Sequence, residues 1–149
     1  MTRARAAVLA ALDAATEPLS AASVAARISV RCDMATVYRA LHHLEETGFA
    51  ESFVLYCAED GVERFYASAH AARAAHDAHA AHDAHAAHRH WFHCESCHRF
   101  VDLGACKIGG LVAEVEQKLD LRVTKHTMYL SGICGDCSKR STRATRTSP

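Results

Sequence analysis

The sequence D-M-A-T-V-Y-R-A-L-H-H-L-E-E-T-G runs from residue 33 to residue 48 and predicts one amphipathic helix. Asp33 is a good N-cap, because its side chain can accept a hydrogen bond from a backbone N–H group of the first turn. Gly48 can end the helix, because glycine readily adopts the left-handed conformation that follows many helices. Three apolar side chains share one face of a helix over residues 34–47: Val37, Leu41 and Leu44. The opposite face is polar.

Two shorter helices are predicted before this one. The first covers residues 2–13 with Thr2 as its N-cap, and the second covers residues 20–28 with Ser20 as its N-cap. Pro18 separates them. Their apolar residues recur at helical spacing and are Val8, Leu9, Leu12, Val24 and Ile28. Three short helices with a tight turn before the last are typical of a helix-turn-helix.

A β-hairpin is predicted directly after the third helix. Residues 49–57 and 62–68 are rich in aromatic and β-branched side chains, and the polar turn between them contains Asp60-Gly61. A helix-turn-helix followed by a hairpin is a winged helix. Residues 1–68 are therefore predicted to form a winged-helix DNA-binding domain.

In a winged helix the third helix enters the major groove of DNA. Its predicted exposed face and the turn before it offer four candidate DNA contacts: Arg31, Thr36, Tyr38 and Arg39. The alternative is that these are ordinary surface residues. Residues 1–66 carry six basic and nine acidic side chains, so DNA binding requires the basic ones to cluster.

Two C-x-x-C elements occupy residues 94–97 and 134–137. Each supplies two thiolates from one tight turn, and two such turns together make the four-sulfur tetrahedron that zinc prefers. One element alone would be ambiguous between a redox motif, half of a metal site and coincidence. The pair predicts a structural zinc site whose ligands are Cys94, Cys97, Cys134 and Cys137.

The segment between the two cysteine pairs predicts a small α/β module over residues 91–137. A strand is expected over 98–103, a helix over 105–120 and a second strand over 121–130. The edges of this sheet would be exposed, and pairing with a second copy would bury them. The predicted fold class is α+β, an N-terminal winged helix-turn-helix followed by an α/β dimerisation domain with a four-cysteine zinc site.

Residues 69–90 form a histidine-rich hinge or linker, with a histidine at every third position from His76 to His88. Such a tract can bind zinc, nickel or copper, or it can be a disordered linker enlarged by repeat slippage. The tail over residues 138–149 combines basic residues with serine and threonine and is predicted to be disordered.

The composition narrows the function classes. The 149 residues include 17 basic and 17 acidic side chains, so the overall charge neither favours nor excludes nucleic acid. No apolar run reaches membrane-spanning length and the N-terminus lacks the apolar core of a signal peptide, which predicts a cytoplasmic protein. Seven cysteines in such a chain favour metal ligands and free thiols over disulfides.

With these parts in view, the sequence resembles the ferric-uptake-regulator family of metal-responsive repressors. The resemblance covers nearly the whole chain and rests on matching segments: residues 2–12, the A-T-V-Y-R-A-L of residues 35–41, Gly48-Phe49, His88-Arg89-His90, both C-x-x-C pairs, His126 and Leu130-Ser131-Gly132-Ile133. The alanine-to-arginine run followed by two cysteine pairs at this spacing is specific.

The resemblance implies a homodimer that binds operator DNA when a regulatory metal is bound. Carried over by position, it gives DNA contacts to Tyr38 and Arg39 and the structural zinc to the four cysteines. It also implies regulatory ligands at five positions: Glu51, His88, His90, Asp102 and His126. The chain departs from the family where Gly109 stands at the position of a usual glutamate ligand. His93, Cys57 or a histidine of the tract are the candidates to substitute for it, and Cys106 is either a ligand or a buried thiol.

The predicted function is a metal-dependent transcriptional repressor of metal-uptake and homeostasis genes. Zinc is favoured as effector over Fe²⁺, Mn²⁺ and Ni²⁺, because the candidate ligands include imidazole and thiolate. Two alternatives are an iron-, manganese-, nickel- or peroxide-responsive regulator of the same family and a histidine-rich metal-storage or chaperone protein. An enzyme is not expected, because four cysteines close the coordination shell of zinc.

Overall fold

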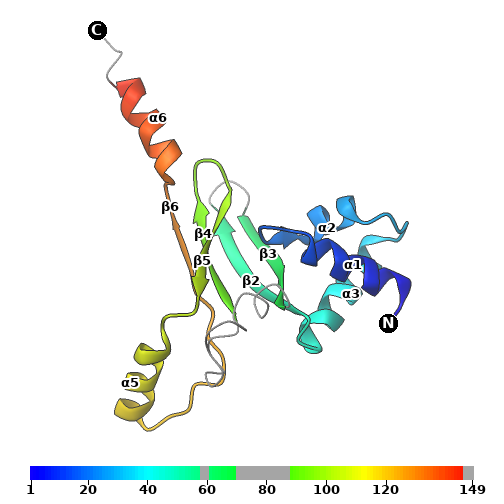
Figure 1. Ribbon diagram of the computed structural model, residues 1–149, viewed down its shortest axis with the longest axis horizontal. Coiled ribbons are helices and arrows are strands. Elements are labelled where there is room, and N and C mark those ends of the chain that lie inside the picture. Colours follow the sequence, from blue (N-terminus) through cyan, green and yellow to red (C-terminus); the bar gives the residue numbers. More distant parts are fainter. Residues whose placement is uncertain (58–60, 70–87, 146–149) are drawn as a thin grey trace.

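The computed structural model describes residues 1–57, 61–69 and 88–145 of the chain (Figure 1). The hairpin turn, nearly all of the histidine tract and residues 146–149 lie outside these ranges, and so do the predictions made for them. The described chain forms a winged helix and a C-terminal module built on a second sheet (Figure 1). None of the described helices is long and apolar enough to cross a membrane.

The three predicted helices are confirmed as α1 (Arg3–Asp13), α2 (Ala21–Arg27) and α3 (Met34–Glu46). Each begins at the predicted N-cap, because a side-chain oxygen there accepts a backbone hydrogen bond from the first turn. Thr2 accepts from Arg5, Ser20 from Ser23 and Asp33 from Thr36, at 3.3, 3.2 and 2.7 Å. The local sequence alone therefore fixes where each helix begins.

One hydrophobic core holds the three helices to the wing. Its fully buried members come from all three helices and match the predicted apolar faces: Val8, Leu12, Val24, Val37, Leu41 and Leu44. Tyr66 closes this core from the wing side. The outer face of α3 is left exposed.

The predicted hairpin is confirmed as β2 (Ala50–Cys57) and β3 (Gly61–Ser68), which pair antiparallel. A short third strand, β1 (Leu19–Ser20), pairs with β3 and completes the sheet in the order β1-β3-β2. The sequence did not indicate β1, because two residues carry no readable period. Ser68 donates a hydrogen bond to Asp13 and so joins the end of the wing to α1.

The C-terminal module contains β4 (Arg89–Cys94), β5 (Phe100–Ala105), α5 (Gly109–Leu119), β6 (Tyr129–Gly132) and α6 (Gly135–Thr145). Its sheet has the order β5-β4-β6, with β5 antiparallel and β6 parallel to β4. The β-α-β prediction is right in outline. The strand β4, which is central to this sheet, was not predicted.

Three boundaries differ from the prediction for physical reasons. The strand β5 continues to Ala105, so α5 starts later than residue 105. Residues 121–128 are not a strand, because the pairing with β4 begins at Tyr129 and no other described strand lies beside them. Residues 138–145 are helical rather than disordered, because the buried Cys134 and Cys137 anchor the first turn of α6.

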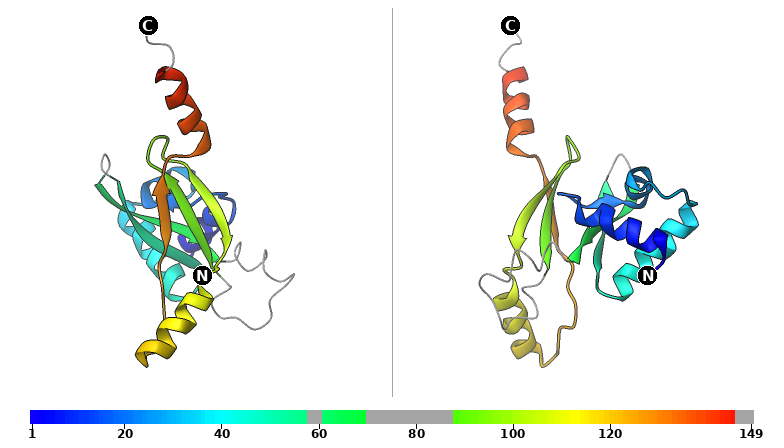
Figure 2. Two further views of the ribbon diagram at one scale, coloured as in Figure 1. Left: turned by 90° about the vertical axis from the view of Figure 1, so that its left-hand side faces the viewer. Right: turned by 45° about the vertical axis from the view of Figure 1, so that its right-hand side comes forward.

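Aromatic side chains join the wing to the C-terminal sheet. Phe53 and Phe65 are cross-strand neighbours on the wing, and both rings contact Phe100 of β5, with centroid distances of 6.0 and 4.9 Å. Phe53 also lies 6.0 Å from Tyr129 of β6. The wing and the second sheet are therefore packed face to face, as the two views of Figure 2 show.

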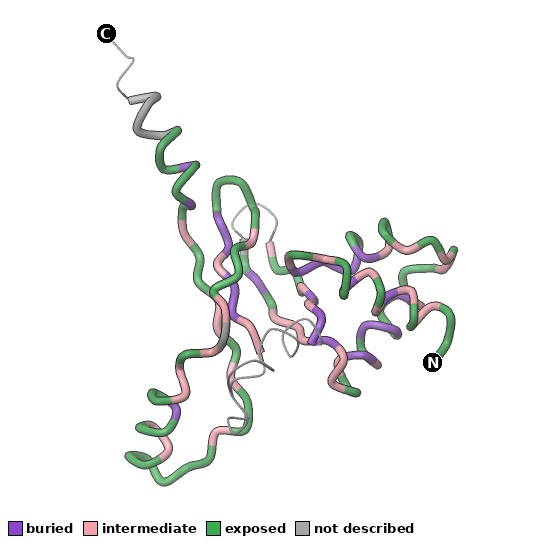
Figure 3. The backbone as a smooth tube through the Cα atoms, in the orientation of Figure 1, coloured by how far each residue is buried: buried purple, intermediate pink, exposed green. Residues whose placement is uncertain are grey.

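Burial is uneven between the halves (Figure 3). The winged helix contains an extensive buried core, whereas the second described cluster consists of Cys94, Cys134 and Cys137 with Phe92 packed against it. A module with so small a core needs a metal or a partner to be stable.

Candidate metal centres

The four predicted zinc ligands meet at one end of the C-terminal sheet. Their sulfur atoms all lie within 4.8 Å of one another, and Cys94, Cys134 and Cys137 are buried. The strands explain the meeting, because β4 ends at Cys94 and pairs there with Gly132, just before the second cysteine pair. The first turn of α6 then presents Cys137.

The spacing of these sulfur atoms fits zinc. At the usual Zn–S length, two sulfurs on a tetrahedral ion lie about 3.8 Å apart, whereas a disulfide brings them to about 2.05 Å. The sulfurs of Cys97 and Cys134 are 3.8 Å apart, and all four cysteines are free thiols. The geometry suits four metal-bound thiolates and excludes a disulfide.

The groups around the four cysteines lower the pKa of some of these thiols and raise the pKa of another. The backbone N–H of Cys134 donates to Cys94 Sγ at 3.3 Å, and this bond is the largest of several that together lower the pKa of Cys94 to about 6 against the effect of burial. A backbone bond from Arg99 acts in the same direction on Cys97, but desolvation and hydrogen bonding with the neighbouring thiols prevail and raise the pKa of Cys97 to about 11. Four thiols this close ionise together only when a cation offsets their mutual repulsion.

A second cluster lies at the opposite end of the same sheet. It consists of His88, His90, Cys106 and His126, whose ligand atoms also lie within 4.8 Å of one another. His126 Nε2 is 2.6 Å from His88 Nε2, 3.4 Å from His90 Nε2 and 3.4 Å from Cys106 Sγ. His126 is therefore the centre of the cluster.

The sheet register brings these residues together from three separate segments. Arg89 pairs with Ala105, so the next residues outward, His88 and Cys106, come to lie opposite each other. On the other side Trp91 pairs in parallel with Tyr129, so the residue three before Tyr129, His126, comes beside His88. The cluster depends on this register, which local sequence patterns do not reveal.

The tautomer of His90 is fixed by its backbone neighbour. His90 Nδ1 lies 3.0 Å from the carbonyl oxygen of Met128, which can only accept, so Nδ1 carries the proton. In the neutral ring the lone pair then sits on Nε2, which faces the cluster. Metal-binding histidines are commonly oriented in this way by a backbone carbonyl.

The distances in this cluster are also close to those of a tetrahedral ion. Two imidazole nitrogens on zinc lie about 3.3 Å apart, and a nitrogen and a sulfur lie about 3.6 Å apart. The 3.4 Å separations of His126 from His90 and from Cys106 agree with these values. The rings of His88 and His126 are closer than that and must separate slightly to admit an ion.

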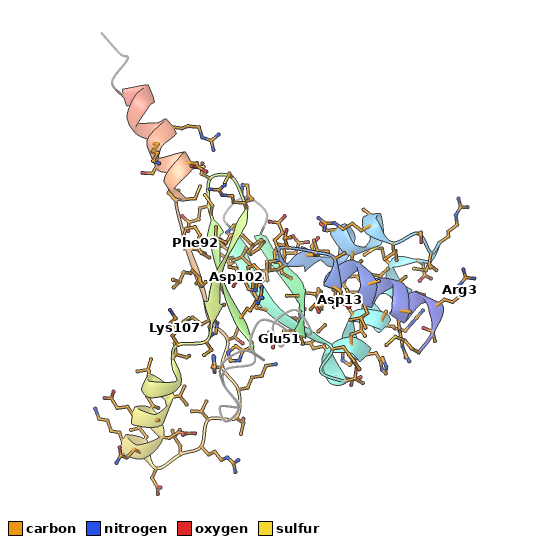
Figure 4. All side chains as sticks on the ribbon, viewed as in Figure 1. Arg3, Asp13, Glu51, Phe92, Asp102 and Lys107 are labelled. Atoms are coloured by element: carbon orange, nitrogen blue, oxygen red, sulfur yellow. The ribbon has the colours of Figure 1, made fainter. Side chains whose placement is uncertain are left out.

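Two of the predicted regulatory residues, Glu51 and Asp102, lie outside the cluster; both are labelled in Figure 4. Asp102 Oδ2 accepts from Arg89 at 2.6 Å, and Asp102 Oδ1 accepts from the backbone N–H of Gly104 at 2.7 Å. Glu51 lies on β2 and lines a cleft of about 750 Å³ between wing and sheet, which the three histidines also line. Cys106, which the sequence left as either a ligand or a buried thiol, lies in the cluster beside the three histidines.

The four candidate DNA contacts lie on or just before α3. Tyr38 is 53% exposed, and Arg39 is exposed with its guanidinium bound to the hydroxyl of Thr36 at 2.9 Å. Arg31 is exposed in the turn that precedes the helix. Three of the candidates, Thr36, Tyr38 and Arg39, thus lie on the part of α3 outside its buried residues, and Arg31 lies in the turn before the helix.

We compared the sequence and the fold with those of known proteins. A family model described as a helix-turn-helix domain matches residues 1–52. No curated protein sequence matches the chain.

Solved structures resemble the chain over nearly its full length. The Helicobacter pylori ferric uptake regulator has a TM-score of 0.63 at 21% identity, covering 93% of this chain and 81% of its own. The Vibrio cholerae ferric uptake regulator has a TM-score of 0.61 at 20% identity, covering 90% and 91%. A zinc uptake regulator solved with zinc and DNA has a TM-score of 0.61 at 19% identity, covering 95% and 85%. The chain thus contains a helix-turn-helix domain and has the fold of the ferric uptake regulators, as the resemblance in its sequence predicted.

Proposed function

We propose that the protein is a metal-dependent transcriptional repressor that senses zinc and controls metal-uptake and homeostasis genes. The observation that carries the proposal is the combination of a helix-turn-helix domain with two metal-ligand clusters at the two ends of one sheet. The first cluster, with four thiols, has the composition of a structural zinc site. The second borders the cleft between wing and sheet, where an ion could change their arrangement.

The proposed roles divide the chain as the sequence suggested. Residues 1–68 are proposed to bind DNA and residues 69–90 to form the hinge, while residues 91–137, together with His88 and His90 at the end of the hinge, hold metal and dimerise. Structural zinc is assigned to the four cysteines, and sensing to His88, His90 and His126. Glu51 is proposed to approach the occupied sensing site from across the cleft when the wing moves, outside the four residues of the cluster, while Asp102 acts at the edge of the site by holding Arg89.

Regulation would work by a shift between arrangements of the two halves. Wing and sheet touch through a few aromatic rings, and such a contact can exist in more than one arrangement. An ion that binds better to the arrangement in which α3 fits the major groove raises its population. The protein is then a repressor only when the metal is bound.

Binding to DNA can be tested with selected duplexes. A random duplex library is enriched on the zinc-loaded protein, and the best sequence is used in fluorescence anisotropy with zinc or chelator. Arg39→Ala is expected to weaken binding roughly tenfold to 100-fold, because a base or phosphate contact contributes about 1–3 kcal/mol. Lys118→Ala, which removes a positive charge from the last turn of α5, serves as the control and should leave binding unchanged.

The outcomes separate the candidate functions. No enriched sequence with zinc, iron, manganese or nickel would contradict the repressor. Many weakly bound ions per chain without DNA binding would favour the metal-storage protein. If a duplex sequence is enriched only with iron, manganese or nickel, the protein is a regulator that responds to that metal and not to zinc.

Dimerisation is the second part of the proposal. The C-terminal module exposes large apolar side chains, each 45–62% accessible: Leu111, Leu119, Leu121, Leu130 and Ile133. Both outer strands of its sheet also have an unpaired edge within the described chain. A second copy would cover these surfaces, as sheet edges and apolar patches require.

Sedimentation velocity of the zinc-loaded protein is expected to give a dimer, about twice the 16.2 kDa chain. Leu130→Lys should shift the protein to monomer, because it places a charge on the apolar surface of β6. The matched control is Val62→Lys on the wing, where the native valine is 70% exposed and the dimer should persist. A wild-type monomer would contradict the assignment.

A further inference from the structure

We propose that Cys106 is the fourth ligand of the histidine cluster and that its thiolate makes this site select zinc over iron(II) and manganese(II). The inference rests on the proposed sensing role of the cluster and adds to it the residue that sets the metal. From the sequence alone, Cys106 could be either a metal ligand or a buried thiol.

The position of Cys106 is determined by the sheet. It follows the last residue of β5 and comes opposite His88 when the β4–β5 register is extended by one residue. Its sulfur is 3.4 Å from His126 Nε2, close to the value of about 3.6 Å for a thiolate and an imidazole on one zinc ion. The end of β5 therefore delivers a sulfur to the three rings.

Packing gives no other reason for a thiol at this position. Cys106 is half-buried but belongs to neither hydrophobic cluster of the described residues. Cys32 is also half-buried, and it packs against the winged-helix core. Cys32 is thus a packing thiol, whereas Cys106 contacts ring nitrogens.

No carboxylate of the described residues enters the cluster. Asp102 already uses both oxygens, and Glu51 is on the wing side of the cleft. Three imidazoles and one thiolate form a tetrahedral set that suits zinc and similar thiophilic ions. Manganese(II) and iron(II) prefer more oxygen ligands and higher coordination, so this set discriminates against them.

Cobalt(II) is the probe for the ligand, because a thiolate on cobalt gives a charge-transfer band in the near ultraviolet that imidazole does not. Full-length protein with zinc retained on the four cysteines is chelated mildly and titrated with cobalt. The wild type and the matched control Cys32→Ser are expected to show the band, and Cys106→Ser is expected to lack it. Any band from the four-cysteine site is common to all three proteins and cancels in the difference spectra.

Affinity gives a second, independent measurement. Zinc binding to Cys106→Ser should be weaker by at least about tenfold, since even residues outside the coordination shell contribute 10–100-fold. Cys106→Asp keeps four donors but exchanges sulfur for oxygen, so its ratio of zinc to manganese affinity should fall by at least about tenfold. Competition titration with a chromophoric chelator measures both.

An unchanged band and unchanged zinc affinity in Cys106→Ser would overturn the inference. If that variant still binds DNA in a zinc-dependent manner, the repressor stands and only the role of Cys106 fails. If the wild type binds no second ion and shows no metal-dependent DNA binding, the proposed function itself fails.

Discussion

Replacing Cys94 with serine is expected to remove the tightly bound metal ion and to unfold the C-terminal module, while the winged helix keeps its structure. Cys94 is fully buried at the end of β4, and among the described residues the small core around it consists of the other buried cysteines and Phe92. Structural zinc contributes on the order of 10–16 kcal/mol in small metal-dependent domains, comparable to or greater than the whole stability of a typical domain. A module with this core should not survive the loss.

Two measurements check this result. Elemental analysis after mild chelation, which removes the sensing ion from both proteins, should show one ion fewer per chain in the variant. NMR spectra should lose dispersion for β4, β5 and β6 but keep it for α1 to α3. Cys32→Ser, which removes a thiol from the winged helix, should keep both the ion and the dispersion. A Cys94→Ser protein with a full complement of metal and a folded sheet would show that the four sulfurs are not a structural site.

Replacing His126 with alanine is expected to abolish the metal dependence of DNA binding without removing the structural ion. His126 touches all three other members of its cluster, at 2.6 to 3.4 Å, so no other single substitution removes as many contacts. Coupling between a metal and a second ligand commonly changes affinity 5- to 150-fold. With zinc present, the variant should therefore bind the selected duplex roughly 5- to 150-fold more weakly than the wild type.

Anisotropy titrations with zinc and with chelator measure the loss. The two curves should coincide for His126→Ala and differ for the wild type. The matched control is His98→Asn beside the four-cysteine site, since His98 has a φ of 58° and asparagine tolerates this left-handed backbone. Full zinc dependence in His126→Ala would place the sensor elsewhere in the chain.

The parts of the fold that local chemistry determines were predictable from the sequence. Thr2, Ser20 and Asp33 each cap a helix as expected, because a cap involves only residues three positions apart. The four cysteines also meet as expected, because each C-x-x-C is a local turn and only one long-range contact is needed to join them.

The parts that depend on pairing between distant strands were not predictable. Cys106 reaches the histidines only through the register of β5 on β4, and Asp102 is held by Arg89 only because those strands are neighbours. Residues 121–128 alternate like a strand, yet they pair with no strand of the described residues. A sequence pattern shows the preference of a segment for strand structure, but it does not show whether a neighbouring strand is available for pairing.

Strand β4 carries proposed metal ligands at both of its ends. His90, near its start, belongs to the proposed sensing cluster, and its last residue, Cys94, belongs to the proposed structural cluster. The strand must be in place before the histidines can assemble, and the four-cysteine site holds its far end. The two ions should therefore be acquired in a fixed order, the first as part of folding and the second as a reversible ligand. In a zinc-starved cell, newly made chains would have to bind the structural ion first, and only then could the sensing site respond to zinc.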